Sequence, residues 1–360
     1  MRKYLCLCLA CVASFPAFAA DDGAYVSLFE GTSAAETSKK NDSDDENSIF
    51  SFLNFKSKKK EPAALNVADE KRLSPVEQAA KLAEKGDVNA QLTLGYLYLY
   101  GGEGVSVDYD KAFEYYAQAA MQNDNVGLNN LGSLYYSGIG IERNPAKAAV
   151  LFEKAAKLGN VEAAVNLGFM KLTGNGVVPN PREAMALFEQ AAAQKNPTAS
   201  FMTGYARYSG NLLERDYRKA AEEIRLAADA KFVEAQYYLA LMYINGLGMP
   251  QNYGNAVKYL KLAVSQGHID AMMTLGDIWE RGEKFTKDLY WAHIMFNLAA
   301  VRGASGAAQR RDALEGRLKI DELLQAQTEA EKFHEKPSEL TSYIQQTFGT
   351  NVHGFIDSAR

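Results

Sequence analysis

A repeated pattern of small residues constrains the fold of this chain more than any other feature. One column of small residues recurs at a spacing of 37 residues and then of 36, at Gly95, Gly132, Gly168, Gly204, Ala240 and Gly276. A second column lies six residues further on and is always glycine, at Gly101, Gly138, Gly174, Gly210, Gly246 and Gly282. Six copies of one unit predict an array in which each unit packs on its neighbours.

Each unit has the sequence signals of two helices joined by a glycine turn. The second glycine column fits the left-handed residue that ends a first helix. An Asp or Asn follows in every unit and suits the N-cap of a second helix; these caps are Asp108, Asn144, Asn180, Asp216, Asn252 and Asp288. The first column lies inside the first helix, where glycine is less favourable than alanine by about 1 kcal/mol. We therefore expect a neighbouring helix to approach closely there.

These columns resemble the Sel-1-like repeat, a relative of the tetratricopeptide repeat, and residues 126–162 match almost every element of its pattern. The resemblance covers residues 74–335. It implies an all-α, right-handed α/α superhelical solenoid of six helix-turn-helix repeats with a helical cap at its C-terminal side, which works by binding proteins. Leu212 and Lys284 replace the second loop glycine of the pattern, and Ala240 replaces the first-column glycine. The first two departures leave the shape of those loops open.

The remaining chain is divided by composition. Residues 1–19 have a basic start, an apolar run and small residues near Ala19, which is the pattern of a cleaved signal peptide. The apolar run is shorter than the ~20 residues that span a bilayer. All three cysteines lie in this segment, so we expect a periplasmic or secreted mature chain without thiols and without a membrane span.

A polar segment over residues 20–73 is expected to be disordered. Its apolar motif at 48–55 could fold back onto the body or bind a partner. The repeats are expected over 74–302, capping helices over 303–336 and a tail over 337–360.

Charge and motifs argue against several functions. The net charge of -5 comes from well-mixed acidic and basic residues, so no nucleic-acid partner is expected. The histidines, at 268, 293, 334 and 353, lack metal-ligand spacing, and no phosphate loop or nucleophile elbow occurs. We therefore predict no cofactor, no metal and no catalysis.

The first helices carry a second apolar stripe opposite their core face. In a solenoid of this family, first helices line the concave side, so the stripe predicts a groove for a protein or peptide partner. The predicted groove residues are Tyr96, Tyr136, Phe169, Leu172, Phe201, Tyr205, Tyr208, Tyr237 and Leu241. Alternatively, these side chains pack against neighbouring first helices. A different function for the same tyrosines is the binding of cell-wall glycan or the regulation of a cell-wall enzyme.

Overall fold

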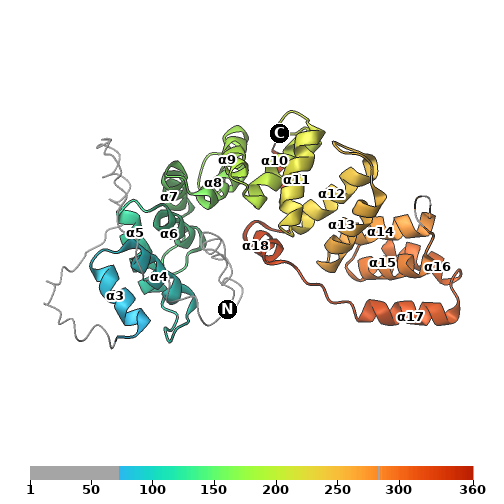
Figure 1. Cartoon of the computed structure of the whole chain (residues 1–360), viewed down its shortest axis with the longest axis horizontal. Helices are drawn as coiled ribbons and strands as arrows, with labels where there is room; N and C mark the ends of the chain where they lie inside the picture. Colours follow the sequence, from blue (N-terminus) through green and yellow to red (C-terminus); the bar gives the residue numbers. More distant parts are fainter. Residues whose placement is uncertain (1–72, 283, 285, 360) are drawn as a thin grey trace. The chain divides into compact units, whose positions relative to one another are not determined.

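The computed structural model describes residues 73–282, 284 and 286–359, and its ordered elements there are α-helices (Figure 1). The predicted signal peptide, the polar segment and its 48–55 motif lie outside these residues. The chain divides into two compact units, residues 1–179 and 180–360. The first unit contains α3 (Pro75–Glu84), α4 (Val88–Tyr100), α5 (Tyr109–Met121), α6 (Asn125–Ser137), α7 (Pro145–Lys157) and α8 (Val161–Thr173).

The second unit continues the same alternation of first and second helices. Its helices are α9 (Pro181–Ala193), α10 (Pro197–Ser209), α11 (Tyr217–Asp229), α12 (Val233–Asn245), α13 (Tyr253–Ser265), α14 (Ile269–Arg281), α15 (Leu289–Val301), α16 (Ala307–Glu315), α17 (Ile320–Glu331), α18 (Glu339–Phe348) and α19 (Gly354–Ser358). The α-solenoid predicted from the repeats is confirmed, and α16 and α17 pack on α15 as the expected cap.

The predicted caps are all in place. Each of the six Asp or Asn side chains accepts a hydrogen bond from the backbone N–H three residues on, as Asn144 does from Lys147 at 3.0 Å. The glycine that ends the first helix is left-handed in five units, with φ between 65° and 76°. Gly101 differs, with ψ near 174°, because the longer loop that follows it closes through a β-bridge between Gly102 and Val105.

The glycines inside the first helices make room for large side chains of the second helices. A Cβ atom on Gly132 would lie 2.9 Å from the ring of Phe152, and one on Gly276 would lie 2.6 Å from the ring of Phe296. The second-helix residues form a column of their own, namely Tyr116, Phe152, Phe188, Ile224, Leu260 and Phe296. Tyr116, Phe152, Ile224 and Phe296 thus pack into the gaps that the missing side chains of Gly95, Gly132, Gly204 and Gly276 leave, and the expected close approach is confirmed in these four units.

The replacement of the loop glycine by Leu212 in the fourth unit does not change the backbone conformation at that position. Leu212 adopts φ 66°, close to the 68° to 78° of the corresponding Gly140, Gly176 and Gly248. The left-handed backbone therefore persists without glycine. Residues on both sides of Lys284 lie outside the described ranges.

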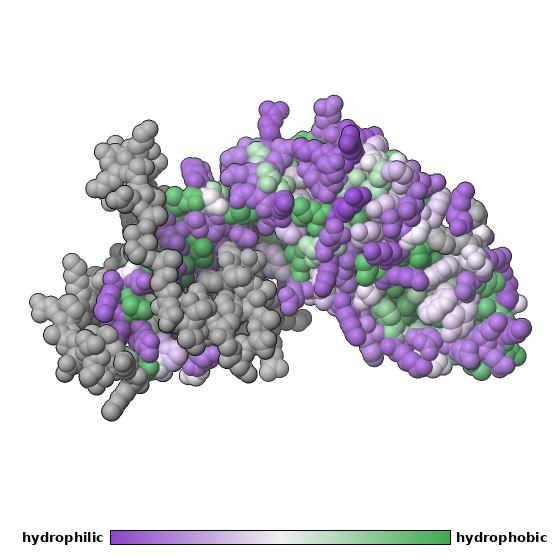
Figure 2. Space-filling view, viewed as in Figure 1, coloured by the Kyte–Doolittle hydropathy of each residue, from purple (hydrophilic) through white to green (hydrophobic). Residues whose placement is uncertain are grey.

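The segment expected to be a tail contains two helices. Residues 337–360 include α18 and α19, and Ile344, Val352 and Ile356 in this segment are buried. Its burial shows that it packs on the body of the second unit. Among the described residues, no helix is long and apolar enough to cross a membrane. Hydrophilic side chains are spread over the visible face of each unit, with small hydrophobic areas between them (Figure 2).

Candidate partner-binding face

In the first unit, two of the predicted groove residues are accessible. Tyr96 is 36% exposed, and its ring centroid lies 4.8 Å from that of Tyr100. Tyr136 is half-buried, and its hydroxyl accepts a hydrogen bond from Asn175 at 3.0 Å. Phe169 and Leu172, by contrast, are buried within the helix array. Any contact made by this part of the stripe therefore centres on the two tyrosines.

In the second unit, the first predicted residue of the stripe belongs to the core. Phe201 is 0% exposed and packs edge-on against Phe232, with ring centroids 5.0 Å apart. Its ring also lies 6.1 Å from that of Tyr238 on the next first helix. For Phe201 the structure thus agrees with the alternative interpretation, packing between first helices, and a partner could not reach its ring.

Four tyrosines of α10 and α12 form a connected aromatic surface, which we call the tyrosine face: Tyr205, Tyr208, Tyr237 and Tyr238. Tyr238 joins the others, with its ring centroid 4.9 Å from Tyr205, 5.6 Å from Tyr208 and 5.4 Å from Tyr237. Leu241 lies half-buried one turn further along α12. Burial raises the pKa of all four phenols, so they remain neutral hydrogen-bond donors at physiological pH.

Residues 336–358, which we call the docked segment, lie against this surface. Its first residue contacts the end of α13, where the N–H of Lys336 donates to the carbonyl of Ser265 at 2.8 Å. It then places α18 at the start of α12 (Figure 1). There the N–H of Val233 donates to the Thr341 hydroxyl at 3.1 Å, and the Ser338 hydroxyl donates to the carbonyl of Lys231 at 2.8 Å.

Gln266 connects the docked segment to the repeats. Its side-chain nitrogen donates to the carbonyl of Lys231 at 3.0 Å and to the side-chain oxygen of Gln236 at 2.9 Å. Its side-chain oxygen accepts from the N–H of Ser338 and from the hydroxyl of Thr341, both at 2.8 Å. All four polar contacts of a buried amide are therefore used, two of them for the docked segment.

The far end of the docked segment reaches the tyrosine face itself. The carboxylate of Asp357 accepts from the hydroxyl of Tyr205 at 2.8 Å and from the amide of Asn211 at 3.2 Å. The ring of His353 lies 5.1 Å from Tyr205 and 5.4 Å from Tyr238. Its Nδ1 atom is 3.8 Å from a carboxylate oxygen of Glu234.

The sequence argument missed most residues of this contact. Tyr238 and Gln266 belong to no repeated column that carries the same residue type in every unit. The signal that was available is local: Ser338 precedes an acidic and then an amphipathic run, which is a helix start. It could have predicted α18, although not the surface on which α18 lies.

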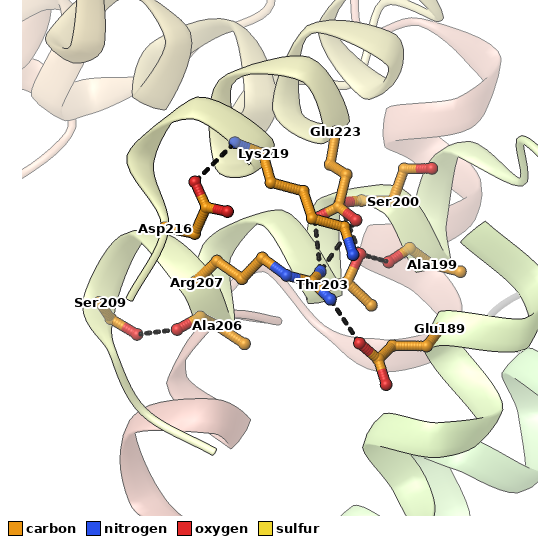
Figure 3. A network of polar contacts seen from close by, with 10 residues as sticks. All are labelled: Glu189, Ala199, Ser200, Thr203, Ala206, Arg207, Ser209, Asp216, Lys219 and Glu223. Atoms are coloured by element: carbon orange, nitrogen blue, oxygen red, sulfur yellow. Dashed lines mark hydrogen bonds and ion pairs between the residues drawn. The ribbon is translucent and has the colours of Figure 1, made fainter. Parts of the chain in front are cut away.

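An ion-pair network links α10 to α9 and α11 (Figure 3). Arg207 of α10 points between Glu189 of α9 and Glu223 of α11, and its Nη1 atom donates to both carboxylate oxygens of Glu223 at 2.8 and 2.7 Å. Burial raises the pKa of Glu223, although the guanidinium of Arg207 opposes this shift. The network therefore joins three consecutive helices. No group of His, Cys, Asp and Glu residues with the arrangement of a metal site occurs in the described part of the chain.

Comparison with known proteins identifies the repeats. The Sel1 repeat model matches residues 88–124, 126–160, 161–196, 197–231 and 233–268. The sixth predicted unit is not in this match, although α14 and α15 form the same kind of helix pair. A comparison with curated proteins found no match.

Solved structures share the fold. A protective antigen of uropathogenic Escherichia coli with an SLR fold aligns at a TM-score of 0.53 and 22% identity, over 79% of this chain and 66% of that one. This chain thus spans slightly less than two thirds of that antigen, and the likeness shows the fold alone. A Sel1 repeat protein from Oxalobacter formigenes aligns at a TM-score of 0.53 and 26% identity, over 65% of this chain and 94% of that one.

Sel1 repeat proteins are generally non-catalytic scaffolds for protein interaction. The repeat matches, the helix pairs with their caps and the shared fold lead to one conclusion: the chain belongs to the Sel1 repeat family.

Proposed function

We propose that this chain is a non-catalytic protein-binding scaffold that holds a segment of a partner protein against its first helices. The observation that carries the proposal is the docked segment, a stretch of protein bound to α10 and α12 through backbone groups, hydroxyls and one carboxylate. A surface that binds one protein segment in this way has the chemistry to bind another.

The first unit has an accessible surface of its own on its first helices. Tyr96 and Tyr136 each present an aromatic body with a polar tip, a combination enriched among the residues that dominate protein interfaces. Tyr96 lies one residue after the first-column glycine of its unit and Tyr136 lies four after its own, so both occur on the same stripe of successive first helices. A partner segment that runs across α4 and α6 would contact both.

Replacing Tyr96 and Tyr136 together with alanine should weaken partner capture roughly tenfold or more, because anchor residues of an interface typically contribute more than about 1 kcal/mol each. The measurement is chemical cross-linking in the native cell, followed by affinity purification and mass spectrometry of the recovered proteins. Val178→Ala is the matched control, because Val178 is 85% exposed in a loop. Circular dichroism and thermal unfolding of each variant check that the fold is kept.

Equal recovery of the same proteins by the double variant would rule out the first-unit tyrosines as anchors. A parallel sedimentation assay with purified peptidoglycan sacculi tests the glycan alternative. If the wild-type chain pellets with sacculi and the double variant does not, the tyrosines bind sugar rings instead of protein.

We further propose that the chain is exported, with residues 1–19 removed, and that its partner belongs to the cell envelope or to a host. Fractionation of the native cell should place the chain in the periplasm or the medium. N-terminal sequencing of that material should begin at Ala20. Recovery of the chain from the cytoplasm with residues 1–19 intact would refute export.

A further inference from the structure

We propose that the tyrosine face of the second unit is a peptide-binding site that the docked segment occupies as a displaceable intramolecular ligand. The ligand class is a short helix capped by the pair Ser-x-x-Thr, with a buried β-branched side chain one turn later and a carboxylate beyond the helix. This inference deepens the proposed scaffold function and rests on it, but it concerns a separate surface from the tyrosines of the first unit.

The start of the ligand is recognised by groups that the repeat already provides. Gln266 donates to Lys231 and Gln236, and in the first unit Gln122 makes the same two donations, to the carbonyl of Gly86 at 3.1 Å and to Gln91 at 2.9 Å. This geometry holds the glutamine amide in one orientation. In the second unit its oxygen is directed at the ligand, where it accepts from a backbone N–H and a hydroxyl. A ligand without that hydroxyl would leave the buried amide oxygen with one donor fewer.

The centre of the ligand is apolar and buried. Ile344, one turn after Thr341, is fully buried, as is Ile356 beside the carboxylate of Asp357. A ten-residue helix and a five-residue helix cannot bury such side chains by themselves, so the burial comes from contact with the repeats. Removing these side chains from water favours the docked state.

The end of the ligand is selected by neutral donors. Tyr205 and Asn211 both donate to the carboxylate of Asp357. Because burial raises the pKa of Tyr205, its hydroxyl keeps its proton and can donate a hydrogen bond to an anionic acceptor. An uncharged residue in place of Asp357 would lose the stronger, charge-assisted form of these bonds.

The docked segment has the properties of a ligand that can leave. An isolated helix of ten residues is marginal in water, so α18 gains its order from docking and would lose it on release. Of the stretch between its two helices, residues 349–351 are exposed and Val352 is buried. Its tether to α17 supplies an effective concentration in the millimolar range, which favours the intramolecular ligand over a free peptide of equal intrinsic affinity.

The test uses the full chain and a fluorescein-labelled peptide with the natural sequence of residues 334–360. A weakened-segment variant, Thr341→Ala with Asp357→Asn, should bind this peptide at least about tenfold more tightly than the wild-type chain, because its own segment competes less well. Adding Gln266→Ala or Tyr205→Phe to the weakened-segment variant should remove most of that gain. Fluorescence anisotropy measures the binding, and thermal unfolding checks each variant.

Two controls separate recognition from general effects. Tyr243→Phe in the weakened-segment variant removes a phenolic hydroxyl from α12 away from the tyrosine face, where Tyr243 stacks on Tyr259 of α13, and should leave peptide binding unchanged. A peptide carrying Thr341→Ala and Asp357→Asn should bind poorly to every chain. Tyr205→Phe keeps the ring and removes only the hydroxyl, so it remains informative if Gln266→Ala fails to fold.

Three results would overturn the inference. The weakened-segment variant could fail to bind the peptide up to millimolar concentration, or the wild-type chain could bind it equally well. The weakened-segment variant with Tyr205→Phe could also bind the peptide as tightly as the same variant without this change. None of these results touches Tyr96 or Tyr136, so the capture experiment on the first unit would still decide the scaffold function independently.

Discussion

Replacing Arg207 with alanine should lower the free energy of unfolding of the second unit by about 3 to 5 kcal/mol, the loss typical when one partner of a buried ion pair is removed. Arg207 bridges Glu189 and Glu223, and the side chains of Arg207 and Glu223 are 7% and 16% exposed. Without the guanidinium, the carboxylate of Glu223 stays in a buried site with only the weaker support of Lys219 and Thr203. Urea unfolding followed by circular dichroism measures the difference.

The loss from Arg207→Ala should shrink in acid. In the wild-type chain, burial already raises the pKa of Glu223 while Arg207 opposes it, so removing Arg207 raises this pKa further. The folded variant then binds a proton more readily than the unfolded chain, whose Glu titrates near pH 4.3. The destabilisation is therefore largest above the folded pKa and falls as the pH drops through it towards the unfolded value.

Glu189→Ala is the matched control for this network. The side chain of Glu189 is 44% exposed, so losing its pairing should cost no more than about 1 kcal/mol. If Glu189→Ala destabilises the unit as much as Arg207→Ala does, or if the Arg207→Ala loss is the same at every pH, an unpaired Glu223 is not its cause.

The parts of the fold that were predictable from sequence are those set within one unit. A cap such as Asn144 bonds to the backbone three residues on, and a glycine such as Gly132 faces a ring twenty residues later in the same helix pair. Contacts this local repeat whenever the unit repeats, so six copies make them visible as columns. The pattern thereby predicted both the helix ends and the close packing between paired helices.

The predicted groove shows where the same reasoning stops. A second apolar stripe on the first helices indicated a partner surface, yet each first helix has a neighbouring first helix on its flanks, and Phe201 and Phe169 are buried. Periodicity shows that a side chain is apolar on a given face, but not whether a neighbouring helix or a partner covers it.

The contacts of the docked segment could not be predicted from the repeat pattern for a different reason. Its contacts join Ser338 to Gln266 over 72 positions and Thr341 to Val233 over 108. Nothing in a repeat pattern encodes a pairing between a unique segment and one particular unit. The residues that recognise the segment, Gln266 among them, carry ordinary structural roles elsewhere in the array, as Gln122 does.

Gly248→Ala should destabilise the second unit by about 2 to 5 kcal/mol. The left-handed backbone costs a non-glycine residue about 1–2 kcal/mol, and overpacking costs about 1–3 kcal/mol. Gly248 lies in the loop between α12 and α13 at φ 71°, and a Cβ atom there would overlap the backbone carbonyl of Tyr217 at the start of α11. A backbone group cannot rotate away as a side chain can, so the loop or the helix must shift.

Gly246→Ala, two residues earlier in the same loop, separates the two contributions. Gly246 has φ 65°, but a Cβ atom there would have no neighbour closer than 3.6 Å. It should therefore cost only the left-handed penalty of about 1–2 kcal/mol. The difference between the two variants in urea unfolding measures the contact between the loop of one repeat and the second helix of the repeat before it. Equal losses would mean that this contact adds nothing to the stacking of repeats, whereas a larger loss at Gly248 makes the loop glycine a determinant of how closely successive units pack.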